Sequence, residues 1–531
     1  MTGPSQPEDL SLSDRNLVRS SAAVALGTML SRLTGLVRVS AMAYAIGTKT
    51  LADTYNVANN TPNIVFELIL GGVLTATLVP LFVDAYERDD DQAASAIFGT
   101  AMTVLVGLTV ISVIAAPLIA HLFTLRTHGA DRHAAQHVAT NLIRLFIPQI
   151  IFYGLTALLS AMLNARRRFL AAAYAPALNN IVVIALFLLL PHMVTGGGLT
   201  LDHVAHSGPL VLILGLGTTA GIVLMGVVLL PAVRAAGIHL QFVVSWRHPA
   251  VRAALRLSGW TVGYVIANQI ALAFVLVIAG NKEGVVSAYT YAFAFFQLPY
   301  GLVAVSIMTT LGPELASLAR RGESDRLRAR FSLGLRSLLV VVTPASVGYI
   351  VLSRQVVVGL IEHGLFTHAS ALLTSDALRA FAVGLVPFSL YLYALRGFYA
   401  LRDTKTPFVI NCFENALNIA FAAVLYPHFG ISGLAYAFSA AYAIAAVAAL
   451  AMLRPRLGGL DGRRTVQTAT KAAIAAFALA IATAVVAHAI SAALVAAIVA
   501  GAVGAVVYLG VLQGLGAEEI RAALSAVRRD R

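Results

Sequence analysis

The chain has 531 residues, of which 59% are hydrophobic and only 11% are charged. Because soluble domains typically carry about 25% charged residues, this composition excludes an ordinary soluble protein and makes lipid the expected surroundings of most of the chain. The net charge of +13 alone would be compatible with nucleic-acid binding, and the single cysteine, Cys412, excludes a disulfide framework and a cysteine-based metal site.

The N-terminal region predicts a short polar tail followed by an uncleaved membrane helix. The first apolar stretch begins near Val18 and contains Arg32 and Arg38. It is far longer than the apolar core of a signal peptide. We therefore expect residues 1–18 to form a cytoplasmic tail and the first transmembrane helix to follow directly.

Apolar runs of about 20 residues, the length that crosses a bilayer as a helix, recur along the rest of the chain. They predict an all-α polytopic membrane protein of about fourteen helices, at residues 19–46, 51–86, 94–122, 134–164, 169–191, 208–233, 250–280, 284–319, 326–353, 372–401, 406–427, 431–453, 466–489 and 492–514. Several runs are longer than a bilayer requires, so we expect tilted helices, with kinks at Pro62 and Pro299.

Lysine and arginine residues are unevenly distributed between the predicted loops. With the N-terminus in the cytoplasm, 24 of the 37 lie in tails and loops on that side, and 5 lie in loops on the outer side. Basic residues accumulate on the cytoplasmic side of membrane proteins, next to anionic lipid headgroups. The distribution predicts that both termini are cytoplasmic, and it explains the net charge without nucleic acid.

The chain also contains an internal repeat. Residues 177–179 and 416–418 both read Ala-Leu-Asn, at an offset of 239, and Pro80 corresponds to Pro313 at an offset of 233. Helices one to six therefore resemble helices seven to twelve in parallel orientation. We expect an N-lobe at 19–235, a C-lobe at 250–454, a helix pair at 466–514 and a cytoplasmic tail at 515–531. Two such bundles are typical of alternating-access transporters, and an ancient duplication in a structural membrane protein is the alternative.

Polar side chains at membrane depth are costly, so their positions are informative. Asn56, Asn59, Asn60 and Asn63 recur at helical spacing and share one face of the second helix. Such a face lines a water-filled cavity or forms hydrogen bonds between helices. Arginine can bind phosphate with two parallel hydrogen bonds, which favours a role in substrate binding. For Arg32 and Arg256, the alternatives are a structural ion pair with an acidic residue and a position at the membrane interface. The residues that we expect to bind substrate are Arg32, Arg38, Asp53, Asn59, Asn60, Asn63, Glu67, Arg256 and Gln297.

A lone carboxylate in the eleventh helix indicates a second site. Glu414 stands in an apolar run together with Asn411, Asn415 and Asn418, which supply further oxygen atoms near the same face. Hard cations prefer oxygen ligands, and a buried carboxylate can instead take up a proton. The hypothesis is a coupling site for Na⁺ or H⁺, and the alternative is an ion pair between Glu414 and Arg396.

Motifs of enzyme active sites are missing from the sequence. It contains no phosphate-binding glycine loop that leads into Lys-Ser or Lys-Thr, no HExxH, and no paired carboxylates in a predicted soluble loop. We therefore expect a protein that is not an enzyme and holds no resident cofactor or metal.

The first two helices resemble the MurJ/MviN family of lipid II flippases, which belong to the MATE-like superfamily of multidrug, oligosaccharidyl-lipid and polysaccharide exporters. The resemblance is carried by Ser31-Arg32-x-x-Gly35-x-x-Arg38, then Ala52-Asp53, Pro62-Asn63 and Val79-Pro80. It implies that the protein carries lipid II, an undecaprenyl-diphosphate-linked disaccharide-pentapeptide, to the outer leaflet of the bacterial inner membrane for peptidoglycan synthesis. It further implies that Arg32 and Arg38 are cavity arginines and that helices thirteen and fourteen hold the lipid tail.

The chain departs from the family pattern at several positions. The family often has a basic residue where Asn60 stands, another near Phe66 and an arginine near Ala294, and an acidic residue often stands where this chain has Val39. The cavity is therefore expected to be less cationic than in typical members, with Arg256 as a hypothetical compensating charge. The expected partners are lipid II and membrane lipids, with the cell-wall synthesis machinery as a further possibility. The alternatives are an exporter of another polyprenyl-linked glycan and a cation-coupled MATE-type drug antiporter.

Overall fold

The computed structural model describes residues 8–67, 72–88, 90–125, 131–194, 199–252 and 259–517. Within these ranges the regular secondary structure is entirely helical. This confirms the predicted all-α membrane fold. Eleven described helices are long and apolar enough to cross a membrane, and α16 with α17, bent by 47°, would form a twelfth. The predicted number of about fourteen is compatible with this result, because the test covers described residues only.

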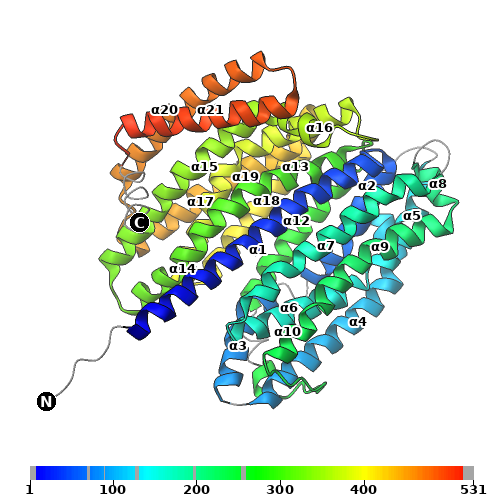
Figure 1. Cartoon of the computed structure of the whole chain (residues 1–531), viewed down its shortest axis with the longest axis horizontal. Coiled ribbons are helices and arrows are strands. Elements are labelled where there is room, and N and C mark those ends of the chain that lie inside the picture. The colour runs from blue at the N-terminus through cyan, green and yellow to red at the C-terminus, as the bar shows by residue number, and fades with distance from the viewer. Residues whose placement is uncertain are drawn as a thin grey trace.

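In the described ranges, ten α-helices form the first bundle, which we call the N-lobe (Figure 1). They are α1 (Glu8–Ile46), α2 (Thr50–Phe66), α3 (Gly72–Glu87), α4 (Asp91–Phe123), α5 (Asp131–Phe146), α6 (Gln149–Ala165), α7 (Phe169–Leu189), α8 (Leu201–Ala205), α9 (Gly208–Val227) and α10 (Leu229–Ala235). A 3₁₀ turn, η2 (Leu190–Met193), follows α7. Helix α1 packs along α7 and lies on the side of the N-lobe that faces the second bundle.

The second bundle, which we call the C-lobe, follows residues 253–258, which lie outside the described ranges. It consists of α12 (Gly259–Ala279), α13 (Val285–Pro299), the π-helical turn η3 (Tyr300–Ala304), α14 (Val305–Arg320), α15 (Ser324–Ile361), α16 (His368–Val383), α17 (Leu385–Ala400), α18 (Lys405–Phe429) and α19 (Ile431–Arg456). The last two helices, α20 (Gly462–Ala489) and α21 (Ala493–Gly514), pack together against α15 at the edge of the C-lobe.

Two expected single helices are divided. The fourth is interrupted at Ile147 and Pro148, between α5 and α6, and the tenth is bent at Gly384, between α16 and α17. At Pro299 the helix widens into η3 because proline removes one backbone hydrogen bond. Helix α2 continues through Pro62 as far as Phe66.

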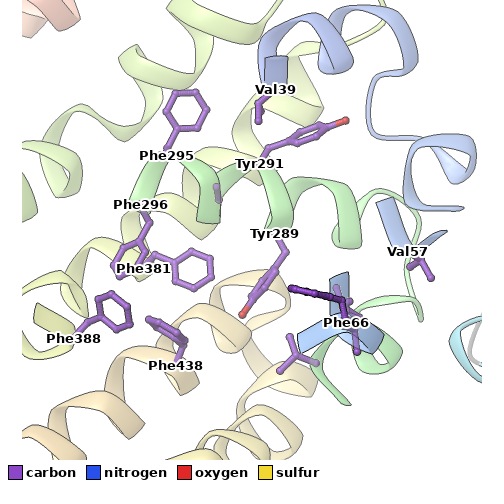
Figure 2. Packing of buried hydrophobic residues seen from close by; sticks show 14 of the residues in the cluster. Val39, Val57, Phe66, Tyr289, Tyr291, Phe295, Phe296, Phe381, Phe388 and Phe438 are labelled. Carbon is purple, nitrogen blue, oxygen red and sulfur yellow. The ribbon is translucent and has the colours of Figure 1, made fainter. Parts of the chain in front are cut away.

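The core of the C-lobe is aromatic. The ring of Phe296 lies 5.5 Å from those of Phe381 and Phe438 and 5.4 Å from that of Phe388, measured between centroids. Figure 2 shows these four rings gathered on one side of α13, with Tyr291 on the other. Rings at such separations attract one another beyond the effect of their buried area. They therefore hold α13, α16, α17 and α19 together as a unit.

The basic loops lie together at one end of the bundle, which we call the basic end. Arg328 donates a hydrogen bond to the Gly458 carbonyl oxygen, and Arg456 pairs with Asp403. These contacts join the first turns of α15, the turn before α18 and the segment at the end of α19. The turns that precede α2, α13 and α16 lie at the opposite end (Figure 1).

Candidate functional site

A cavity of about 400 Å³ lies between the two lobes. Its walls come from α1, α2, α6, α7 and α9 of the N-lobe and from α13 of the C-lobe. Six of the nine side chains expected to bind substrate line it, namely Arg32, Arg38, Asn59, Asn60, Asn63 and Gln297. Residues that are far apart in the sequence thus meet in one polar space.

Arg32 and Arg38 are the only charged side chains among the described residues that line this cavity. Neither guanidinium has an ion-pair partner within the described ranges, so the alternative of an ion pair between Arg32 and an acidic residue is not found there. Both side chains are half-buried and lie six residues apart, nearly two turns, on α1. A diphosphate is a suitable ligand for two such guanidinium groups, because each can donate two parallel hydrogen bonds to phosphate oxygens.

The sequence did not single out three polar lining residues, which are Tyr153, Asn179 and Asn180. The Asn180 side chain donates to the Ser31 carbonyl oxygen and to the Thr34 hydroxyl, both at 3.0 Å, and so fixes α7 against α1 beside the arginines. The paired asparagines within the apolar run of the fifth helix are a signal that identifies Asn179 and Asn180. No such signal marks Tyr153.

Three of the four departures from the family pattern lie in this cavity. Val39, Asn60 and Ala294 line it, whereas Phe66 is buried with its ring centroid 5.8 Å from that of Tyr153. The cavity therefore has two cationic side chains from the described part of the chain. Arg256, the proposed compensating charge, lies outside the described residues.

Asp53 and Glu67 do not line the cavity. Glu67 stands half-buried at the end of α2. The Asp53 carboxylate accepts hydrogen bonds from the backbone N–H groups of Gly284 at 2.7 Å and Ser287 at 2.8 Å, and from the Ser287 hydroxyl at 2.6 Å. It thereby caps the N-terminus of α13 from the other lobe.

The cap is reciprocal. Glu283 stands just before α13 and accepts hydrogen bonds from the Thr50 N–H at 3.0 Å and the Thr50 hydroxyl at 2.9 Å, at the start of α2. Each of two helix N-termini therefore receives a carboxylate from the opposite lobe, where unpaired N–H groups and the helix dipole favour negative charge. We call the residues Thr50, Asp53, Glu283, Gly284 and Ser287 the interlobe cap.

Close backbone contacts seal the same end. Leu365 donates its N–H to the Tyr44 carbonyl oxygen at 2.9 Å, and the Tyr291 hydroxyl donates to the Gly47 carbonyl oxygen at 3.0 Å. Gly47 has a φ of +62°, and a Cβ atom there would approach the Leu365 carbonyl oxygen to 2.6 Å. The lobes are thus joined at the end opposite the basic end.

The interlobe cap leads to a first prediction, that Asp53→Ala opens this end of the protein. Hydrogen bonds to charged groups contribute about 1.5–3 kcal/mol each, so loss of the carboxylate should shift the closed-to-open ratio at least about tenfold. Spin labels at the exposed positions Lys49 and His363, in a Cys412→Ser background, should gain a population at longer separation.

Asp202→Ala is the matched control, because Asp202 is an exposed carboxylate in the short helix α8 and pairs only with His206 among the described residues. It should leave the label separations unchanged. If Asp53→Ala gives the same separations as the wild type, the cap does not hold the lobes together.

A second cluster of polar atoms lies inside the C-lobe. Asn411 and Asn415 donate to Asn268 Oδ1 on α12, at 3.1 and 3.0 Å. Glu414 is completely buried, and both of its carboxylate oxygens lack a hydrogen-bond partner in the described structure. The same holds for the side-chain oxygens of Asn411 and Asn418. No ion pair with the exposed Arg396 is formed there, so the alternative pairing for Glu414 is not found.

These residues share one face of α18, since they are three or four positions apart. Buried polar groups are normally satisfied, and a buried charge without a partner is strongly unfavourable. The cluster therefore offers oxygen atoms that a bound cation could satisfy, or a carboxylate that could take up a proton.

The fold is shared with solved transporters of the MATE type. A structure described as a lipid II flippase MurJ in an inward closed conformation matches 92% of this chain and 97% of its own with a TM-score of 0.74 and 22% identity. An inward-facing multidrug resistance MATE family transporter matches 82% of this chain and 96% of its own with a TM-score of 0.65 and 16% identity. Fold and cavity together define a two-lobed polytopic membrane protein that has the fold of these solved structures.

Sequence comparison gives the particular family. The model of the family described as "Lipid II flippase MurJ" matches residues 42–504. A probable lipid II flippase MurJ from Rhizobium meliloti (strain 1021) is 31% identical over 430 residues, which are 80% of this chain and 78% of that protein. Its counterpart from Haemophilus influenzae is 28% identical over 427 residues, covering 77% of this chain and 81% of that protein. The chain belongs to the MurJ family, as its first two helices had suggested.

Proposed function

We propose that this protein flips lipid II from the cytoplasmic to the outer leaflet of the inner membrane, without chemical change to the lipid. Membership in the MurJ family supports the substrate. The observation that carries the proposal is the central cavity, in which two guanidinium groups stand without a described acidic partner. They would hold the diphosphate while the polyprenyl tail remains in the bilayer, along α20 and α21.

Alternating access would proceed by separation of the lobes at the interlobe cap. The basic end would face the cytoplasm, because basic loops favour that side, and both termini would lie there. In the present arrangement the opposite end is sealed by the contacts of Asp53, Gly47 and Tyr291. Release of the headgroup outside would require these contacts to break, and the differential affinity of the lipid for the two states would drive the change.

The energy for net transport would come from the membrane potential and from an ion bound at Glu414. Each elementary charge that crosses the membrane contributes about 2.3 kcal/mol per 100 mV. Lipid II is anionic, so its outward movement is favoured when the inside is negative. Na⁺ or H⁺ at the cluster of Glu414, Asn411, Asn415 and Asn418 would couple the return of the empty cavity to ion entry. We further propose that the cell-wall synthesis machinery receives the flipped lipid.

The test is depletion of the protein in its bacterial host, followed by measurement of the lipid II that is exposed on the outer leaflet. We expect lipid II to accumulate facing inward and exposure to be restored by the wild type. Unchanged exposure after depletion would exclude lipid II as the substrate and leave the fold assignment intact.

A further inference from the structure

A separate cavity of about 540 Å³ lies within the C-lobe, at the basic end. Its walls come from α12, η3 and α17 and from the turn before α18, and none of its lining residues also lines the central cavity. The residues that matter here are Thr261, Tyr264, Tyr300, Arg396, Tyr399 and Thr404. Its volume lies within the range of about 300–1,000 Å³ that is usual for ligand sites.

The chemistry of this C-lobe cavity is that of an anion site with apolar walls. Arg396 is the only charged residue among the described residues that line it, and its guanidinium has no ion-pair partner among them. Asp403, the acidic residue nearest to the rim in the sequence, is engaged by Arg456 and by the Thr406 N–H. Hydrogen bonds to Asp403 outweigh its desolvation and hold the pKa of its carboxyl at about 2, so it stays ionised and paired.

The remaining lining suits an amphiphile. Three tyrosine rings and the side chains of Val265, Leu392 and Leu395 form apolar walls, and two threonine hydroxyls lie at the rim. Arginine beside tyrosine is a recurrent way to bind phosphate groups that carry an apolar substituent, because the guanidinium donates to the phosphate while the rings cover the substituent. Arg396 and Thr404 stand near the end of α17 and just before α18, next to the Asp403–Arg456 pair of the basic end.

Tyr300 connects this cavity to the central one. It is the first residue of η3 and lines the C-lobe cavity together with Arg396. Gly301, the next residue of the π-turn, packs against Arg32, since a Cβ atom there would approach Arg32 Nε to 3.0 Å. The two unpaired arginines therefore stand on either side of η3.

We propose that the C-lobe cavity is a second phosphate site, which binds the headgroup of an anionic lipid from the leaflet at the basic end. The inference deepens the proposed transport function, since the ligand is either a membrane phospholipid or the transported diphosphate lipid before it reaches Arg32. Both share a phosphate ester on an apolar chain, and binding measurements can separate them.

The test uses the purified full-length protein and native mass spectrometry with phosphatidylglycerol, zwitterionic phosphatidylcholine or undecaprenyl diphosphate as probes. We expect Arg396→Gln to weaken binding of an anionic probe about tenfold, the effect of one lost charge-assisted contact. Phosphatidylcholine should bind weakly to every variant. The control is Arg320→Gln, which changes an exposed arginine at the end of α14 outside both cavities. It should bind the anionic probes as the wild type does.

Thr404→Asp gives a second test that does not remove the arginine. Thr404 is the N-cap residue of α18 and its side chain makes no capping hydrogen bond, so aspartate should be tolerated there. Its negative charge at the rim should repel the headgroup and weaken binding to a similar extent, whereas Thr404→Asn, the uncharged match, should not.

The results separate the two sources and the two proposals. If Arg396→Gln weakens the binding of phosphatidylglycerol, the ligand of the C-lobe cavity is a membrane phospholipid. If it weakens the binding of undecaprenyl diphosphate alone, the ligand is the transported lipid. Equal affinities of the wild type, Arg396→Gln and Thr404→Asp for both anionic probes would overturn the second site. That result would leave the lipid II flippase proposal standing, because the latter is tested by exposure of lipid II in cells.

Discussion

Replacing both central arginines with alanine is expected to abolish lipid II flipping. Arg32 and Arg38 are the only described cations of the central cavity, and neither has an acidic partner whose charge would be left unpaired by the substitution. Each hydrogen bond to a charged group contributes about 1.5–3 kcal/mol. Loss of one arginine should therefore reduce lipid II flipping about 10–100-fold, and loss of both should reduce it at least about 100-fold. The measurement is outer-leaflet lipid II exposure in depleted cells that carry Arg38→Ala or the double variant.

The departures from the family pattern offer a gain-of-function control. Asn60 and Ala294 line the same cavity but are uncharged, so Asn60→Arg or Ala294→Arg should restore part of the exposure lost in Arg38→Ala. Arg320→Ala, at the exposed end of α14, should behave as the wild type. Normal exposure in the double variant, with the protein present in the membrane, would contradict binding of the diphosphate at this cavity.

Hydrophobic runs were sufficient to predict most helices, because a bilayer requires a length and polarity that few other structures share. Interruptions were harder to predict. The break at Pro148 and the bend at Gly384 lie inside apolar runs of uniform hydropathy. In such runs, only packing against neighbouring helices determines where the helix axis changes direction. The start of α4 was placed three residues late, since the side chain of Asp90 caps it by accepting from the Ala93 N–H at 2.8 Å.

For the central cavity, the sequence predicted those lining residues whose polarity is unusual at membrane depth. Arg38 and the asparagines of α2 stand out because charges and amides are costly in lipid. Asp53 was expected in the same site, and sequence spacing could not show otherwise. Its partners, Gly284 and Ser287, lie more than 230 positions away and are brought to it only by the packing of α2 against α13.

Loss of the Glu414 carboxylate should remove ion dependence from transport. If Na⁺ binds this cluster, it stabilises the folded protein by an amount that grows with concentration, about 2.7 kcal/mol at one hundred times its dissociation constant. Thermal unfolding of the purified wild type should then shift upward in Na⁺ relative to choline. The shift should vanish in Glu414→Gln, which keeps the size of the side chain and removes its charge.

Proton coupling gives a different pattern from sodium coupling. Na⁺ would then have no effect on the wild type, while flipping would respond to an imposed pH gradient, and Glu414→Gln would lose that response. Glu323→Gln, at the basic end and outside the cluster, should match the wild type in both assays. A Glu414→Gln protein that keeps every ion response of the wild type would contradict a coupling role. The buried Glu414 oxygens would then require another stabilising partner, because an unpaired charge at that depth is too costly to persist.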